Sequence, residues 1–179
     1  MMGGTATATS TPGRGSEFRV SFLARPATVT PRRRASDQNS TESDQRQQLK
    51  TSNLRILLVD DHPINRQVAN LFLRPFNLRV VEAVNGAEAL EALAREEFDV
   101  VLLDMHMPVK DGPTTIREIR ASDEKWKDVP VIALTADAMS GDKERYLAMG
   151  MNGYLSKPLA ERELVSEMLR VIGDAADSQ

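Results

Sequence analysis

The sequence predicts an α/β fold in which a doubly wound, five-stranded parallel sheet carries helices on both faces. From Leu54 onward, a short apolar run, a polar turn and a helical period follow one another repeatedly. Several of the apolar runs are aliphatic at every position, which is typical of parallel strands buried on both faces. Strands that alternate with helices in this way form one parallel sheet with right-handed crossovers.

The expected elements can be placed by their residues. Apolar runs predict strands at Arg55–Val59, Val80–Ala83, Val100–Leu103, Val131–Leu134 and Gly153–Leu155. Helical periodicity predicts helices at Ile64–Arg74, Ala87–Arg95, Pro113–Ala121, Ser140–Met149 and Glu161–Val171. Two prolines support these bounds, because Pro75 cannot continue a helix and Pro113 fits the first helical position.

The residues before Leu54 have a different character. Residues 25–53 are rich in Pro, Ser, Thr, Gln and Arg and contain no aromatic residue, so we expect a disordered linker there. Residues 17–24 alternate apolar and polar side chains, as a strand does, and the Thr/Ala-rich residues 5–11 can form its partner across a Pro-Gly turn. A lone hairpin is only marginally stable in water, which indicates a piece of a larger domain.

Composition excludes several classes of protein. The absence of cysteine excludes disulfides, thiol nucleophiles and Cys-ligated metals, and two histidines are too few for a His-rich metal site. Residues 54–179 carry a net charge of −7 against +4 for residues 1–53, which argues against nucleic-acid binding. No apolar run reaches the ~18 residues that span a bilayer, and no secretory signal peptide is evident. We therefore expect a cytoplasmic segment without nucleic-acid or direct membrane contact.

The unusual polar residues follow the ends of the predicted strands. They are Asp60, Asp61, Asp104, Thr135 and Lys157. A doubly wound sheet binds ligands outside the carboxyl ends of its strands, so these residues should share one edge. Three carboxylates at one place need a cation, and oxygen ligands suit Mg²⁺ better than zinc. A hard cation, a carboxylate nucleophile, a lysine and a hydroxyl together suit phosphoryl transfer, and the P-loop signature is absent.

Residues 54–172 resemble the receiver domain of two-component signalling, which has a flavodoxin-like fold. Four motifs carry the resemblance: V-D-D-H-P-I-N-R at 59–66, L-L-D-M-H-M-P-V-K-D-G at 102–112, A-L-T-A-D-A at 133–138 and G-Y-L-S-K-P-L at 153–159. The I-N-x-x-V-A start and the A-x-x-G-D-x-x-x-Y-L stretch resemble receivers of hybrid histidine kinases.

The N-terminal residues carry a second resemblance. Met2-Gly3-Gly4 and the run from Pro12 to Phe18 resemble the end of the catalytic ATP-binding domain of histidine kinases. The two resemblances imply the following organisation: a kinase-domain remnant at 1–24, the linker at 25–53, a receiver domain at 54–174 and a short tail at 175–179.

The receiver resemblance implies a role for each acidic residue. Asp104 is implied as the phosphoacceptor, which attacks the phosphorus of a phosphohistidine. Asp60 and Asp61 are implied to hold Mg²⁺ together with Asp104 and the backbone carbonyl of His106. Taken without this resemblance, Asp104 would be a strand-end cap and the Asp60–Asp61 pair would favour the N-terminus of the next helix.

The resemblance also implies roles for residues around the acids. Lys157, before a proline that is usually cis, pairs with one phosphoryl oxygen, and Thr135 donates a hydrogen bond to another. Tyr154 is implied as the rotating aromatic of the switch, while His106 and Asp137 occupy rate-tuning positions. In isolation, strand propensity explains Thr135, core packing explains Tyr154 and passive exposure explains His106.

These roles predict a phosphoacceptor receiver in a two-component phosphorelay, carried by a hybrid sensor histidine kinase. The segment would catalyse its own phosphotransfer and dephosphorylation, whereas the kinase core and any membrane anchor would lie in parts of the parent chain not present. The expected partners are the dimerisation domain that carries the phosphohistidine and a histidine phosphotransfer protein. The alternatives are a stand-alone regulator that acts by protein binding and a pseudo-receiver that works without phosphorylation.

Overall fold

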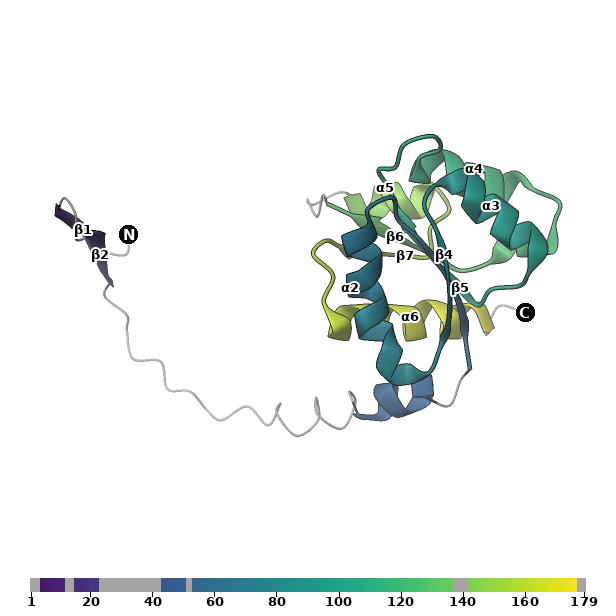
Figure 1. Cartoon of the computed structure of the whole chain (residues 1–179), viewed down its shortest axis with the longest axis horizontal. Helices are drawn as coiled ribbons and strands as arrows, with labels where there is room; N and C mark the ends of the chain where they lie inside the picture. Colours follow the sequence, from purple (N-terminus) through teal and green to yellow (C-terminus); the bar gives the residue numbers. More distant parts are fainter. Residues whose placement is uncertain (1–3, 12–14, 23–42, 51–52, 137–141, 177–179) are drawn as a thin grey trace. The chain divides into compact units, whose positions relative to one another are not determined.

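The computed structural model describes residues 4–11, 15–22, 43–50, 53–136 and 142–176. The chain divides into two units, Met1–Ser36 and Asp37–Gln179. In the first unit, β1 (Gly4–Thr11) pairs antiparallel with β2 (Gly15–Phe22), so the predicted hairpin is confirmed (Figure 1). The expected strand residues Leu23 and Ala24 lie outside the described residues, and the assignment to a kinase domain stays a prediction.

The second unit contains a five-stranded sheet with the strand order β4-β3-β5-β6-β7. Its strands are β3 (Arg55–Val59), β4 (Arg79–Ala83), β5 (Val100–Asp104), β6 (Val131–Thr135) and β7 (Gly153–Ser156). All neighbouring pairs are parallel. The chain runs from β3 to the edge strand β4 and then returns to β5 on the other side of β3. This reversal creates the switch point at which such sheets bind ligands.

Helices cover both faces of the sheet, as predicted (Figure 1). They are α2 (Pro63–Leu73), α3 (Gly86–Arg95), α4 (Gly112–Ala121), α5 (Asp142–Ala148) and α6 (Glu161–Ala176). The helices α3, α4 and α5 pack with Leu57 and Val59 in one core, and α2 and α6 pack with Ile56 and Leu58 in the other. Alternate residues of β3 therefore enter opposite cores, which explains why the whole strand is apolar.

Local signals set the helix ends. The Asn85 side chain accepts hydrogen bonds from the first backbone N–H groups of α3, and Asp111 caps α4 in the same way. After α2, Pro75 lies in a 3₁₀ turn, η1 (Arg74–Phe76), and a second 3₁₀ turn, η2 (Lys125–Asp128), precedes β6. The sequence did not predict either turn. Across the described ranges, no helix has the length and apolar character needed to cross a membrane.

One correction concerns the end of the linker. The expected disordered linker covered residues 25–53, but the structure forms a helix at residues 43–50. Its Leu49 is fully buried in the same core as Leu73. The prediction averaged the polar composition of the whole segment, whereas one apolar side chain with a place in the core suffices to dock a short helix. The remaining linker residues through 42, and residues 51 and 52, lie outside the described residues.

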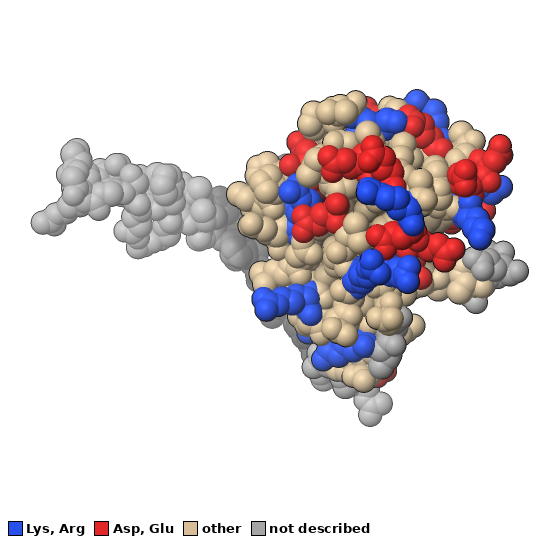
Figure 2. All heavy atoms as spheres, turned by 45° about the vertical axis from the view of Figure 1, so that its right-hand side comes forward, with Lys and Arg blue, Asp and Glu red and all other residues tan. Residues whose placement is uncertain are grey.

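Charged side chains of both signs are mixed on one face of the molecule. On the face seen in Figure 2, acidic and basic side chains lie next to one another rather than in blocks of one sign. Among the described residues, Lys110 in the loop before α4 pairs with Glu118 on α4, and Arg170 pairs with Glu167 within α6. Exposed pairs of this kind contribute little to stability.

Candidate functional site

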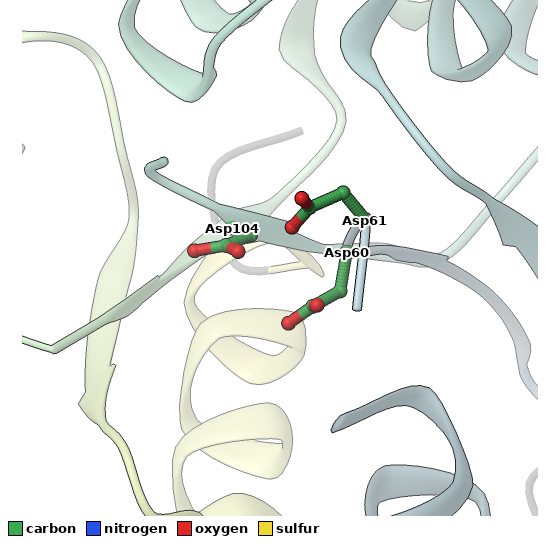
Figure 3. Close-up of side chains that lie close together, drawn as sticks. All are labelled: Asp60, Asp61 and Asp104. Atoms are coloured by element: carbon green, nitrogen blue, oxygen red, sulfur yellow. The ribbon is translucent and has the colours of Figure 1, made fainter. Parts of the chain in front are cut away.

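Three carboxylates meet at the carboxyl edge of the sheet. Asp60 and Asp61 directly follow β3, and Asp104 is the last residue of β5, the neighbouring strand. One oxygen from each carboxylate lies within 4.8 Å of the others (Figure 3). Asp60 is fully buried and Asp104 is 4% exposed, whereas Asp61 is exposed. The structure thus brings together the acids that the sequence grouped by strand position.

Lys157 lies between two of these acids. Its ammonium nitrogen is 2.7 Å from Asp60 Oδ2 and 2.8 Å from Asp104 Oδ2. The backbone N–H of Lys157 donates to the carbonyl of Thr135, which ties the residue after β7 to the end of β6. The peptide bond before Pro158 is cis, as the resemblance implied. One positive charge therefore offsets part of the repulsion between the carboxylates.

The carboxylate of Asp60 is held by the start of α2. Its Oδ1 accepts a hydrogen bond from the backbone N–H of His62 at 2.8 Å. The Asn65 amide donates to both carboxylate oxygens at 3.1 Å, and Arg66 donates to the Asp60 carbonyl at 2.7 Å. Asn65 belongs to the V-D-D-H-P-I-N-R motif, but the sequence did not predict a role for it. The position of its amide shows that it anchors Asp60.

Burial and charge act on the pKa values of the acid and the lysine in opposite ways. Burial raises the pKa of the Asp104 carboxyl, and the hydrogen bond and charge of Lys157 oppose that rise without cancelling it. The negative charge of Asp60 raises the Asp104 pKa further. Burial alone would lower the pKa of Lys157, but its bonds to Asp104 and Asp60 raise it overall. Lys157 is therefore held in its charged form.

The end of β6 contributes a buried hydroxyl. Thr135 is fully buried, and its Oγ1 lies 2.8 Å from the hydroxyl oxygen of Tyr146 on α5. Tyr146 is 3% exposed, and its ring centroid lies 6.4 Å from that of Tyr154 on β7. Tyr146 belongs to the A-x-x-G-D-x-x-x-Y-L stretch, but the sequence did not predict its contact with Thr135. Tyr154, the expected switch residue, is partly buried beside it.

The remaining predicted residues have mixed outcomes. The His106 side chain is exposed, while its backbone N–H donates to Asp104 Oδ1 at 3.3 Å. Its expected roles in tuning the rate and in metal binding through its carbonyl stay predictions. Asp137, the other expected rate-tuning residue, lies outside the described residues.

One protein family matches most of the second unit. Residues 56–169 match the model of the response regulator receiver domain. The sensor histidine kinase GacS of Pseudomonas protegens is 37% identical over 153 residues, which cover 84% of this chain and 16% of the relative. Hybrid signal transduction histidine kinase M of Dictyostelium discoideum is 40% identical over 121 residues, covering 65% of this chain and 5% of the relative. The chain thus spans a small part of the relatives that it matches.

Solved structures give the same result at the level of the fold. The receiver domain of the sensor histidine kinase PA1611 from Pseudomonas aeruginosa is 42% identical, with a TM-score of 0.62. The match covers 68% of this chain and 99% of that domain, which was solved with a magnesium ion coordinated in its active-site cleft. The chemotaxis protein CheY4 of Vibrio cholerae is 30% identical, with a TM-score of 0.62, and the match covers 67% of this chain and 99% of CheY4.

Proposed function

Since this chain belongs to the response regulator receiver domain family, we propose that Asp104 accepts a phosphoryl group from a phosphohistidine. The observation that carries the proposal is the Asp104 carboxylate itself. It ends a buried strand beside two other acids, with the Lys157 ammonium 2.8 Å away. This arrangement concentrates a nucleophile and positive charge where phosphoryl oxygens would gather.

The transfer exchanges one bond to phosphorus for another. A carboxylate oxygen of Asp104 attacks the phosphorus, a P–O bond forms, and the P–N bond to the imidazole breaks. The electron pair of the P–N bond stays on the imidazole nitrogen, which takes up a proton from water, and the product on Asp104 is an acyl phosphate. Lys157, already in contact with the acid, turns its ammonium to a phosphoryl oxygen, and the Thr135 hydroxyl donates to another.

The donor set at this edge fits a magnesium ion. Three carboxylates against one ammonium leave an excess of negative charge, and carboxylate oxygens are ligands that Mg²⁺ prefers. Asp61, Asp104 and the carbonyl of His106 would hold the ion, with Asp60 behind them. When bound, the ion neutralises the acids and the phosphoryl oxygens, so that the carboxylate can approach the phosphorus. The magnesium in the Pseudomonas aeruginosa receiver supports this reading.

The parent protein in this proposal is a hybrid sensor histidine kinase in the cytoplasm or anchored to a membrane by other segments. Its support is that the similar proteins are sensor and hybrid kinases, of which this chain covers 16% and 5% of the length. The phosphoryl donor is then the histidine of the kinase dimerisation domain, and a histidine phosphotransfer protein is the acceptor of the next step. The presence of Asp60, Asp61, Asp104, Thr135 and Lys157 together argues against a pseudo-receiver.

A labelling experiment tests the proposal. The chain is incubated with acetyl phosphate, with and without Mg²⁺, and phosphorylation is followed by mass spectrometry. We expect a label on Asp104 only with Mg²⁺, and no label in Asp104→Asn. The control variant Asp123→Asn, at an exposed position after α4, should label as the native chain does. Acid-labile phosphate on His106 with Asp104 unlabelled would overturn the proposal.

A further inference from the structure

Two buried hydroxyl groups connect the site to helix α5. Thr135, at the end of β6, is fully buried, and Tyr146 is 3% exposed. Their oxygens lie 2.8 Å apart, within the hydrogen-bond range for two hydroxyls. Hydrogen bonds in a buried environment are stronger electrostatically than exposed ones, and leaving such a hydroxyl unpaired is costly. The contact is therefore expected to persist when either residue moves.

The chemistry of a hydroxyl allows this contact and a phosphoryl contact at the same time. A threonine hydroxyl has one proton to donate and two lone pairs that accept, and a tyrosine hydroxyl also donates one proton. If Tyr146 donates to Thr135, the Thr135 hydroxyl still has its own proton, which it can donate to a phosphoryl oxygen at the acid cluster. The tyrosine then determines which way the threonine proton points.

Resting on the proposed function of Asp104, we propose that Tyr146 is a positioning residue for phosphoryl recognition. Its hydroxyl donates to Thr135, directs the Thr135 proton toward a phosphoryl oxygen and transmits the displacement of Thr135 to α5. The pairing does not break during the switch, because breaking it would leave the Tyr146 hydroxyl buried without this partner.

The arrangement of the two tyrosines favours this path. The Tyr154 ring lies 6.4 Å from the Tyr146 ring, with a 32° angle between the ring planes, so Tyr146 contacts both Thr135 and Tyr154. From the sequence, we expected Tyr154 to respond directly to the movement of Thr135. In the structure, Tyr146 is hydrogen-bonded to Thr135 and its ring is paired with that of Tyr154. We therefore expect a movement of Thr135 to reach Tyr154 through Tyr146.

The test removes one oxygen atom. Tyr146→Phe keeps the ring and its packing but deletes the hydroxyl. With acetyl phosphate and Mg²⁺, we expect Asp104 still to be labelled, at a rate lower by about three- to tenfold, the size expected for loss of one hydrogen bond. With beryllofluoride, which stands in for the phosphoryl group, amide shifts should reach residues 142–148 in the native chain. They should stop at Thr135 in the variant.

Three further variants separate positioning from packing. In Thr135→Val, which lacks the partner hydroxyl, adding Tyr146→Phe should produce no additional change in rate or in amide shifts. Thr135→Ser keeps the hydroxyl and should keep the α5 response, which also covers the case in which Tyr146→Phe unfolds. Tyr154→Phe removes the other tyrosine hydroxyl and should likewise retain the α5 response.

The outcomes distinguish this inference from the proposed function. A native α5 response and a native rate in Tyr146→Phe would overturn the inference, and so would additive effects of Tyr146→Phe and Thr135→Val. In both cases Asp104 would still be labelled, and the proposed function would stand. Failure to label Asp104 in the native chain would instead overturn the proposed function.

Discussion

The Lys157 ammonium lies 2.7 Å from Asp60 and 2.8 Å from Asp104, so one lysine bridges two acids at the ends of neighbouring strands. Asp60 is completely buried and Asp104 nearly so. The bridge explains how both carboxylates are accommodated at the edge of an apolar sheet. It also means that the protonation of Asp104 depends on Lys157.

Removal of the lysine charge should raise the pKa of Asp104. Burial already raises this pKa, and the hydrogen bond and charge of Lys157 are the largest opposing effects. In Lys157→Met we expect the Asp104 carboxyl to titrate at higher pH than in the native chain, measured by ¹³C NMR of the side-chain carboxyl. Lys110→Met, which breaks the pair with Glu118 on α4, is the matched control and should leave the titration unchanged.

The direction of the Asp104 shift also has a consequence for stability. Because the folded state binds this proton more tightly than the unfolded chain, stability due to Asp104 falls as pH rises from its ordinary value of 3.8 through the raised pKa. The fall should be larger in Lys157→Met, as urea unfolding across this pH range can measure. An equal pH dependence in both proteins would contradict the role of Lys157.

Asn65 should stabilise the fold through Asp60. Its amide donates to both oxygens of a buried carboxylate, so Asn65→Ala should lower the free energy of unfolding by about 1–3 kcal/mol. Asn70→Ala provides a control on the same helix, because the Asn70 amide donates to Glu82 at an exposed position. We expect a change within about 0.5 kcal/mol for that variant. Equal losses in the two variants, measured by urea unfolding, would refute the anchoring role.

The sequence predicted the fold and the acids because both depend on short local patterns. Each apolar run predicted a strand to within one residue at either end, as for Val100–Leu103 against the observed Val100–Asp104. The site followed because parallel strands end at a common edge. Residues Asn65 and Tyr146 were missed because their roles depend on which atoms meet after helices pack. No local pattern specifies that a hydroxyl on α5 reaches Thr135.

Leu49 should determine where the folded unit begins. It is fully buried although it belongs to a polar segment, so Leu49→Ala should lower the free energy of unfolding by about 2–5 kcal/mol. Leu71→Ala is the matched control, because the Leu71 side chain is 64% exposed on α2. Removal of residues 1–50 should destabilise the chain as Leu49→Ala does, whereas removal of residues 1–42 should not. Equal stability of the two truncated chains would place the boundary after this helix.

The protein should be more stable with glycine than with valine at position 109. It follows Asp104 in the loop before α4, is 87% exposed and has a φ of 70°, a region that a β-branched residue adopts at a cost. Val109→Gly should therefore raise the free energy of unfolding by up to about 1 kcal/mol. Val84→Gly, at an exposed valine without positive φ, should instead lower it. A loss of stability in both variants would mean that the Val109 side chain makes a compensating contribution.

The two acids after β3 should separate into a metal ligand and a structural anchor. Asp61 is exposed and takes no part in the lysine bridge, whereas Asp60 is buried and bound by Lys157, Asn65 and the His62 N–H. Asp61→Asn should therefore weaken Mg²⁺ binding about tenfold or more, because it removes a charged oxygen ligand, while urea unfolding without Mg²⁺ changes little.

Asp60→Asn should instead destabilise the chain even in the absence of metal. Loss of its charge leaves the partly buried Lys157 with one carboxylate and disturbs the bonds from α2, so the free energy of unfolding should fall by about 1–3 kcal/mol even without Mg²⁺. Magnesium binding can be followed by calorimetry and stability by urea unfolding in the same buffers. If Asp61→Asn destabilised the metal-free chain as strongly as Asp60→Asn, the exposed carboxylate would be part of the structural network. The separation of roles inferred from burial and hydrogen bonding would then be wrong.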